Sequence, residues 1–262
     1  MLFDRQIFKT TLRQLKVNPR VKLHYWDITD STNKQLWQSL EGDRPLPQIA
    51  IAQQQTAGRG QWGRQWQSSP GGLYLSVAVA PQISISQAPL LTFATAWGIA
   101  SSLRRYAVPV HLKWPNDLIL QQRKLGGIKT ETRTQGDRIV QAVVGVGINW
   151  SNAVPEPGIN LQTFFRDRDR PPISCLEQLA AIALFGILSG CQRLQTENRD
   201  AILTAYTELL CWPQRPLIVD NYPGKIAGVA PTGALRIHLQ TPHGKIEIER
   251  MPGAISLGYD DL

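Results

Sequence analysis

The chain has 262 residues, of which 42% are hydrophobic and 18% are charged, with 28 Lys and Arg against 20 Asp and Glu. This composition is that of a globular protein with a sizeable core, and it excludes the collagen-like, disordered and disulfide-framework classes. The net charge of +8 favours acidic partners such as nucleotides, nucleic acid or an acidic protein, without choosing among them.

Export and membrane insertion are not expected. The longest uncharged apolar stretch, residues 179–191, is shorter than the roughly 20 residues that an apolar helix needs to cross a bilayer. Charged residues between Asp4 and Lys16 interrupt the apolar region of a secretory signal. The three cysteines are widely spaced and have no metal-ligand spacing. Together these features indicate a cytoplasmic protein with reduced thiols.

The segment up to residue 150 alternates between strand-like and helix-like patterns. Strands are expected at residues 21–28, 48–54 and 73–80, with a short helix between the first two that starts at Asp-Ser-Thr-Asn, residues 30–33. A longer helix over residues 88–106 repeats apolar residues every three or four positions, so we expect one face to lie on the sheet. The residues of that face are Leu90, Phe93, Trp97, Ala100 and Leu103. Further strands at 108–113, 117–120, 125–132 and 139–148 are joined by short turns and are expected to pair antiparallel.

The second part of the chain divides at the Trp-Pro pair of residues 212–213. Residues 151–172 are expected to form a loop, followed by helices at 173–194 and 199–210. Short strands cut by Gly and Pro follow at 217–219, 225–229, 234–239 and 245–248, as in a small barrel. We therefore expect an α+β catalytic domain over residues 1–212 and a small β domain over residues 213–262.

Three glycines after the second expected strand, Gly58, Gly60 and Gly63, spell Gly-x-Gly-x-x-Gly. A dinucleotide-binding fingerprint also needs a helix at the third glycine and an acidic residue about 20 positions later. Here the chain continues into Ser-Ser-Pro-Gly-Gly and an apolar strand, and no P-loop Gly-Lys-Ser/Thr follows. What remains is a glycine loop with two arginines and two tryptophans, which is suited to bind phosphate or carboxylate, or else is a solvated hairpin.

Two segments further along the chain carry one lysine each. Residues 113–117 read Lys-Trp-Pro-Asn-Asp, and residues 124–128 read Lys-Leu-Gly-Gly-Ile. Lysines neutralise phosphate oxygens and an aspartate binds magnesium, so the pair is suited to a polyphosphate. Each segment alone is also ordinary turn chemistry. Their joint occurrence with the glycine loop, in this order, is much more specific.

These three segments closely resemble the biotin protein ligase family, which has a Gly-Arg-Gly loop, a Lys-Trp-Pro-Asn-Asp motif and a Lys-Leu-Gly/Ala-Gly-Ile motif. Two further matches are Asp-Ser-Thr-Asn at residues 30–33 and Gly-Val-Gly-Ile-Asn at residues 145–149. Residues 233–235 and 253–257 are similar to the family's C-terminal SH3-like domain. The resemblance covers nearly all of the chain between Leu23 and Gly258.

The resemblance implies a mixed β-sheet catalytic domain covered by helices, of the class II aminoacyl-tRNA synthetase-like or biotin–lipoate ligase fold, with a small SH3-like β-barrel after it. It also implies an ATP-dependent ligase that uses Mg²⁺. The biotin carboxylate attacks the α-phosphate of ATP to give biotinyl-5′-adenylate and pyrophosphate. A lysine of a biotin carboxyl carrier protein, the acetyl-CoA carboxylase partner, then takes the biotinyl group and releases AMP. Since both nucleophiles belong to substrates, no Ser-His-Asp or Cys-His set is needed.

The resemblance also implies a role for each matching residue, and we expect the cations among them to converge on one cleft. Biotin would be bound by Ser31, Thr32, Asn33, Gln55, Arg59, Gly60, Gln61, Lys124 and Gly127. ATP would be bound by Arg59, Arg64, Trp66, Lys113, Asn116 and Asn149. The catalytic residues would be Arg59, Lys113, Lys124 and Asp117. Asp117 would serve either Mg²⁺ or the incoming carrier lysine.

The chain departs from one form of the family's loop. Several members carry Gly-Arg-Gly-Arg-Arg-Gly-Arg, and this chain has Gln61 and Trp62 in place of the two middle arginines. An acyl adenylate hydrolyses in water, so we expect the loop to cover it with measurable but limited leakage. The segment before the first expected strand is too short for the family's winged helix-turn-helix, so DNA binding is not expected. A monomer and a homodimer both remain open.

Three alternatives remain open at this point. The first is a lipoate or octanoyl ligase-type acyltransferase of the same fold. The second is a nucleic-acid-binding module, although the cations are concentrated in glycine loops and do not follow a stripe. The third is a silent biotin sensor, which would bind biotin without releasing pyrophosphate.

Overall fold

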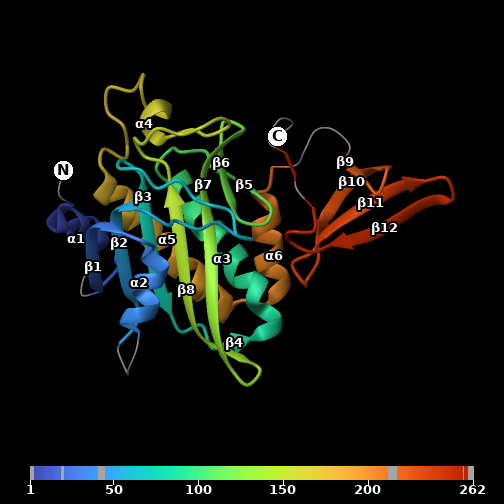
Figure 1. The fold of residues 1–262 in the computed structure, drawn as a ribbon, viewed down its shortest axis with the longest axis horizontal. Helices are drawn as coiled ribbons and strands as arrows, with labels where there is room; N and C mark the ends of the chain where they lie inside the picture. The colour runs from blue at the N-terminus through green and yellow to red at the C-terminus, as the bar shows by residue number, and fades with distance from the viewer. Residues whose placement is uncertain (1–2, 19–20, 41–44, 212–216, 256, 259–262) are drawn as a thin grey trace.

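The structure is a computed structural model that describes residues 3–18, 21–40, 45–211, 217–255 and 257–258. These residues form a large mixed sheet with helices and a small antiparallel sheet that projects from one end (Figure 1). The helices are α1 (Arg5–Gln14), α2 (Thr32–Ser39), α3 (Ala88–Arg104), α4 (Leu161–Phe164), α5 (Leu176–Thr196) and α6 (Arg199–Glu208), with a 3₁₀ turn at Ile85–Gln87. The strands of the large sheet are β1 (Lys22–Thr29), β2 (Gln48–Gln55), β3 (Leu73–Val79), β4 (Ile83–Ser84), β5 (His111–Lys113), β6 (Asp117–Leu120), β7 (Arg123–Gln135) and β8 (Arg138–Ile148).

The large sheet has the order β1-β2-β3-β8-β7-β6-β5, with β4 paired to β8 outside this path. Strands β1 and β2 are parallel, whereas the other pairings in the described residues are antiparallel. The expectation that the strands joined by short turns are antiparallel neighbours is confirmed for β5 to β8. A mixed sheet with helices confirms the expected α+β class.

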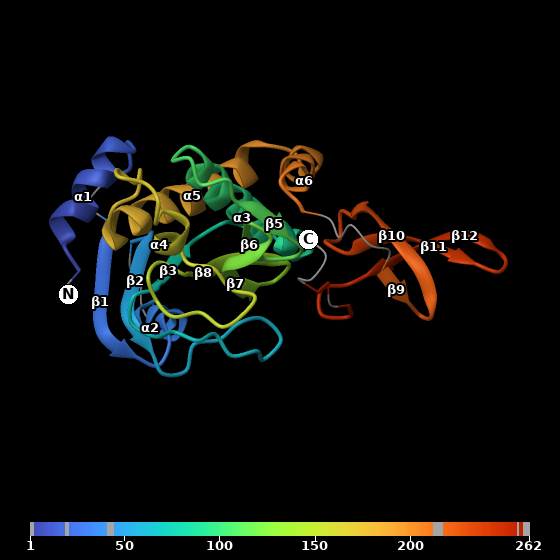
Figure 2. The same ribbon diagram turned by 90° about the horizontal axis from the view of Figure 1, so that it is seen from above.

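The two faces of the sheet carry different layers. Helices α3 and α5 cover one face and α2 lies on the other (Figure 2). Strand β8 shows the alternation that this requires, because Val144 and Val146 belong to the main core whereas Val143 joins a small core with Leu36 of α2. On the α2 face, the two positions of β8 that follow Val143 are glycines, and they leave bare backbone there.

Helix α3 is buried over most of its surface because it packs on the sheet and is flanked by α5 and α6. The expected face is buried as predicted except at Trp97, which is partly exposed and lies under the Arg193 guanidinium of α5, 4.2 Å from the ring centroid. The prediction that Trp97 faces the sheet was therefore wrong. The two helices cross at glycines: a Cβ on Gly186 would lie 2.6 Å from the Cα of Ile99, and one on Gly98 would overlap the Gly186 carbonyl.

The small sheet has the order β12-β11-β10-β9 and is antiparallel throughout. Its strands are β9 (Leu217–Val219), β10 (Tyr222–Val229), β11 (Leu235–Thr241) and β12 (Gly244–Arg250). In the described residues the pairing runs as an open path, so the expected β unit is present without a closed barrel. The expected domain boundary at residues 212–213 lies outside the described residues. No helix in the described ranges is long and apolar enough to span a membrane.

Candidate functional site

A cavity of about 240 Å³ lies on the α2 face of the sheet. Its walls come from the start of α2, the end of β2, the glycine loop, the β5–β6 turn, strands β7 and β8, and the segment after β12. The residues expected from the sequence to bind ligand all line it, except Asn149. Those that do are Ser31, Thr32, Asn33, Gln55, Arg59, Gly60, Gln61, Arg64, Trp66, Lys113, Asn116, Asp117, Lys124 and Gly127.

The floor of the cavity is bare backbone. Gly127 of β7 lies opposite Gly147 of β8, and both line the cavity together with Gly145. A Cβ on Gly145 would overlap the Asn33 side chain, and one on Gly147 would overlap the indole of Trp66. The glycines therefore allow these two side chains to lie directly on the sheet, which no larger residue would permit.

One end of the cavity is polar and largely uncharged. The Ser76 hydroxyl lies 2.6 Å from Asn33 Oδ1 and 2.7 Å from Thr32 Oγ1. Gln55 Oε1 accepts from the Thr32 backbone N–H (2.9 Å) and hydroxyl (3.1 Å). Asn33 is only 7% exposed, and its Nδ2 has no hydrogen-bond partner among the described residues. Since buried donors are normally paired, this end is ready to bind an acceptor atom of a ligand.

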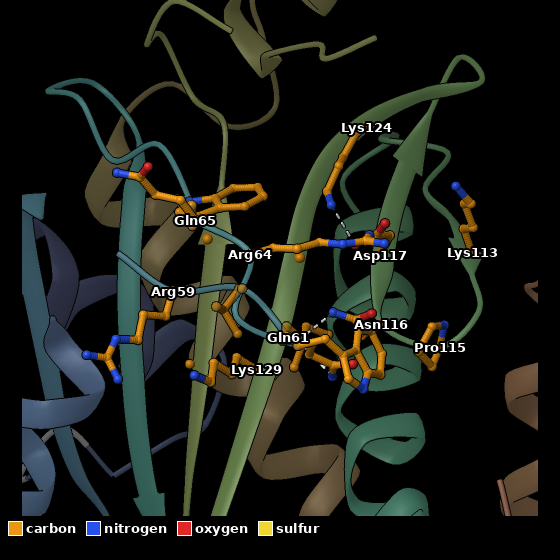
Figure 3. Close-up of a pocket in the computed structure, with 18 of the residues that line it drawn as sticks. Arg59, Gln61, Arg64, Gln65, Lys113, Pro115, Asn116, Asp117, Lys124 and Lys129 are labelled. Carbon is orange, nitrogen blue, oxygen red and sulfur yellow. Dashed lines mark hydrogen bonds and ion pairs between the residues drawn. The ribbon is translucent and has the colours of Figure 1, made fainter. Parts of the chain in front are cut away.

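The other end of the cavity is charged. The Lys124 ammonium of β7 lies 2.9 Å from Oδ1 of Asp117 at the start of β6. The Arg64 side chain extends toward this pair from the glycine loop (Figure 3). Asn116 Nδ2 donates to the Ile128 carbonyl at 2.7 Å and so ties the β5–β6 turn to β7. Short antiparallel pairing between β6 and β7 is what brings residues 117 and 124 together.

Lys113 is the most deeply buried cation of this charged end, with 4% of its surface exposed. Burial lowers the pKa of Lys113 from 10.5 to about 8, against the opposing attraction of the nearby Asp117 carboxylate. The positive charges of Lys124 and Arg64 lower this pKa further. A buried ammonium close to two other cations makes this end of the cavity attractive to an anion.

The glycine loop is a tight hairpin across the cavity. Arg59 and Gln65 pair across it, and the Gly60 N–H donates to the Arg64 carbonyl at 2.7 Å. Beyond the hairpin, the Trp66 indole lies against the floor with Lys124 Nζ at 5.4 Å from its ring centroid. The indole Nε1 is buried without a hydrogen-bond partner in the described residues.

Two expected site residues are placed differently from the others. The Arg59 side chain is directed away from Lys124 and Asp117 (Figure 3), and it also lines a neighbouring groove beside α2. Asn149 is buried outside the cavity, where its Nδ2 donates to the Ile159 carbonyl at 3.2 Å and lies 3.4 Å from the Lys124 carbonyl. All four cations line this one cavity, as expected. Arg64, Lys113 and Lys124 lie at its charged end, whereas the guanidinium of Arg59 is directed away from that end.

Other lining residues were not singled out from the sequence. Lys129 and Glu131 of β7 form an ion pair of 3.1 Å beside the polar end, and Glu131 also accepts the Trp37 Nε1–H at 2.8 Å. Period-two alternation from Gly127 would have found both. Residues of the segment after β12 also line the cavity, although the sequence related residues 253–257 only to the C-terminal β domain and not to the site. They are Gly253, Ile255, Leu257 and Gly258.

Comparison with known proteins gives consistent matches. BirA of Escherichia coli (strain K12), a bifunctional ligase/repressor, is 36% identical over 169 residues, or 60% of this chain and 52% of that protein. BirA of Bacillus subtilis (strain 168) is 33% identical over 129 residues, or 48% of this chain and 40% of that protein. The chain thus spans about half or less of these relatives.

The fold is that of a solved structure, the biotin protein ligase from Aquifex aeolicus in complex with biotin and ATP. The TM-score is 0.70 at 23% identity, over 90% of this chain and 97% of that one. Residues 25–149 match the model of the biotin/lipoate A/B protein ligase family. The matched region contains every residue of the polar end and of the charged end described above. Residues 25–149 of this chain therefore form a domain of the biotin/lipoate A/B protein ligase family.

Proposed function

We propose that this protein joins biotin to a lysine of a biotin carboxyl carrier protein, at the expense of ATP. In the first step a biotin carboxylate oxygen bonds to the α-phosphorus of ATP and pyrophosphate leaves. In the second step the carrier amine, having lost a proton, attacks the mixed anhydride to form an amide, and AMP leaves. The named ligases among the relatives and the biotin and ATP complex of the Aquifex protein support this proposal.

The observation that carries the proposal is the contrast between the two ends of one cavity. Biotin has a neutral cyclic urea at one end and a carboxylate at the other. The polar end offers the Asn33 Nδ2 group, which has no partner in the described residues, and the hydrogen-bonded Thr32 and Gln55 to a urea. The charged end offers Lys124 and Arg64 to a carboxylate and a phosphate. In a binding cavity of this kind, a small number of polar groups in fixed positions determines the orientation of the ligand.

Catalysis would come from positioning and charge. A carboxylate and a triphosphate repel each other, and cations fixed between them lower the free energy of the transition state in which they meet. We assign Lys124 to the carboxylate and α-phosphate, and Lys113 and Arg64 to the other phosphates. Trp66, stacked over the glycine floor, would cover the ring system, and Gly60 and Gln61 would close over the ligand from the hairpin.

Asn116 we assign to the nucleotide side and Asp117 to the acceptor step. Asp117 is already paired with Lys124 at 2.9 Å, and the described residues contain no group of three or more side chains that could hold a metal ion. Magnesium would enter with ATP, bound mainly by its phosphates. The Asp117 carboxylate would instead accept a hydrogen bond from the incoming carrier amine.

The test is to mix the protein with biotin, ATP, magnesium and a biotin carboxyl carrier domain, and to weigh the carrier by mass spectrometry. We expect the mass of one biotinyl group on one lysine, and none with Lys124→Ala. Octanoate in place of biotin tests the acyltransferase alternative. A carrier modified by octanoate and not by biotin would contradict the proposal, and so would biotin binding without pyrophosphate release.

A further inference from the structure

The segment after β12 forms part of the cavity wall. Gly253, Ile255 and Leu257 line the cavity together with Gly60 and Trp62 of the hairpin. Here this segment, residues 251–255 and 257–258, is called the tail strap. Leu257 anchors the tail strap, because its side chain is 5% exposed and belongs to the main hydrophobic core. The small sheet from which the strap leaves is also fixed.

A buried hydrogen bond fixes that sheet on the catalytic part. The Trp114 Nε1–H, next to the cationic Lys113, donates to the Gly233 carbonyl in the β10–β11 turn at 3.0 Å. Gly233 itself has φ +86° and lies so close to α3 that a Cβ there would be 2.5 Å from the Cβ of Pro89. A side chain at residue 233 would push the turn away. The hydrogen bond and the close contact at Gly233 thus fix the position of the small sheet beside the charged end of the cavity.

The hairpin and the tail strap touch at Trp62 and Gly253. A Cβ on Gly253 would lie 2.6 Å from Nε1 and 2.9 Å from Cδ1 of Trp62, so the edge of the indole lies on bare glycine backbone. Both residues have positive φ, +52° at Trp62 and +93° at Gly253. That conformation is uncommon for a large side chain and persists only where the surroundings hold it. The positive φ of Trp62 places its indole on the backbone of Gly253.

We propose that Trp62 and Gly253 latch the hairpin to the tail strap, and that this contact keeps the activated ligand in the cavity. The inference rests on the proposed function and extends it to the small β unit. On its other side the hairpin is tied to β7 by a long hydrogen bond of 3.4 Å from Gln61 Nε2 to the Ile128 carbonyl. Trp62 is a positioning residue: its indole remains 50% exposed, and it acts by fixing the hairpin.

The test measures pyrophosphate release from biotin and MgATP without a carrier. A protein that retains its adenylate gives one burst and then a slow rate equal to the leak. We expect Trp62→Ala and Gly253→Val each to raise the slow rate about tenfold, the factor that corresponds to ~1.4 kcal/mol, with the burst amplitude kept. Because both break one contact, the double variant should leak no more than either single variant. Trp62→Phe, which keeps an aromatic ring, should restore much of the retention.

Matched controls exclude general damage. Gly244→Val places the same side chain at another positive-φ glycine of the small sheet, with open space around it. Tyr222→Ala removes another exposed aromatic ring of that sheet. Both controls should leak like the wild type. If Trp62→Ala raised the leak and Gly253→Val did not, the latch would be wrong and Trp62 would contact the ligand directly. Effects that multiply in the double variant would also overturn the latch.

A second readout needs no activity. Trypsin cleaves after Arg59 and Arg64, so the rate of cleavage at these sites in the ligand-free protein reports whether the hairpin is docked. Both latch variants should be cut faster than the wild type and than Gly244→Val. If the wild type released no pyrophosphate, the proposed function would be wrong, and proteolysis would still decide on the latch. Equal cleavage rates in all variants would refute the latch alone.

Discussion

Replacing the buried Lys113 by methionine should make the protein more stable and inactive. The ammonium is almost fully buried, and burial has lowered its pKa from 10.5 to about 8. At about 1.36 kcal/mol for each pH unit, keeping Lys113 charged at neutral pH costs the folded state about 3 kcal/mol. Methionine has nearly the same length and no charge to bury. The unfolding free energy at pH 7 should therefore rise by up to about 3 kcal/mol. The Tm should rise by ~2–4 °C for each kcal/mol gained.

The pH dependence identifies the cause. Between about pH 8 and 10.5 the unfolded chain keeps a proton on Lys113 that the folded chain has released. The unfolding free energy of the wild type should rise with pH in this window, relative to the variant, because the unfolded state binds more protons. The advantage of Lys113→Met should be full below pH 8 and should vanish above 10.5.

The assay is urea unfolding of both proteins at a series of pH values, with pyrophosphate release measured in parallel. Lys9→Met, which removes an exposed lysine of α1, should change the unfolding free energy by less than about 0.5 kcal/mol, with no trend over this window. The reasoning is refuted if Lys113→Met destabilises the protein at pH 7, or if its advantage does not change between pH 7 and 10.5.

Three further outcomes test the site. Gly145→Ala should weaken biotin binding at least about fivefold in calorimetry, because overpacking against the Asn33 side chain costs about 1–3 kcal/mol. Gly136→Ala, in open space at the β7–β8 turn, should bind normally. Lys124→Ala should nearly abolish pyrophosphate release while the protein stays folded, and near-normal release would remove Lys124 from the mechanism. Asn149→Ala should lower Tm by several degrees, since a lost buried hydrogen-bond partner costs about 1–3 kcal/mol. Because Asn149 supports the chain around Ile159 and does not line the cavity, the KM for ATP should stay unchanged. A raised KM for ATP with a normal Tm would show that Asn149 contacts the nucleotide.

Sequence patterns predicted the sheet well, because its strands are apolar runs between clear turns. Strand β6 was predicted to the residue, and β2, β3 and β8 differ by one residue at an end. Helix α1 was missed, although Phe8, Leu12 and Leu15 recur at helical spacing and Asp4 caps its start. The apolar face of this helix packs on α5. The short helix α4 lies inside the stretch that was expected to be loop, and β5 is shorter than predicted.

The candidate site was predictable where it depends on local motifs. The Lys-Trp-Pro-Asn-Asp and Lys-Leu-Gly-Gly segments lie on neighbouring antiparallel strands, so their side chains meet as expected. Placement that depends on distant packing was not predictable. The side chain of Asn149 donates hydrogen bonds to the carbonyls of Ile159 and Lys124. The tail strap reaches the cavity from the small sheet, which a hydrogen bond from Trp114 helps to hold in place.

The crossing of α3 and α5 limits how this protein can be stabilised. Substituting alanine for a helical glycine ordinarily gains about 1 kcal/mol, which makes Gly98, Gly186 and Gly190 obvious targets for an engineer. At each of them an added methyl group would strike the backbone of the facing helix, within 2.6 Å of Ile99 Cα at residue 186. Such changes would wedge the two helices apart and tilt the sheet whose opposite side carries the ligand floor. Substitutions meant to raise the Tm should therefore be made at solvent-exposed positions of these helices, and the glycines at the α3–α5 crossing should be kept.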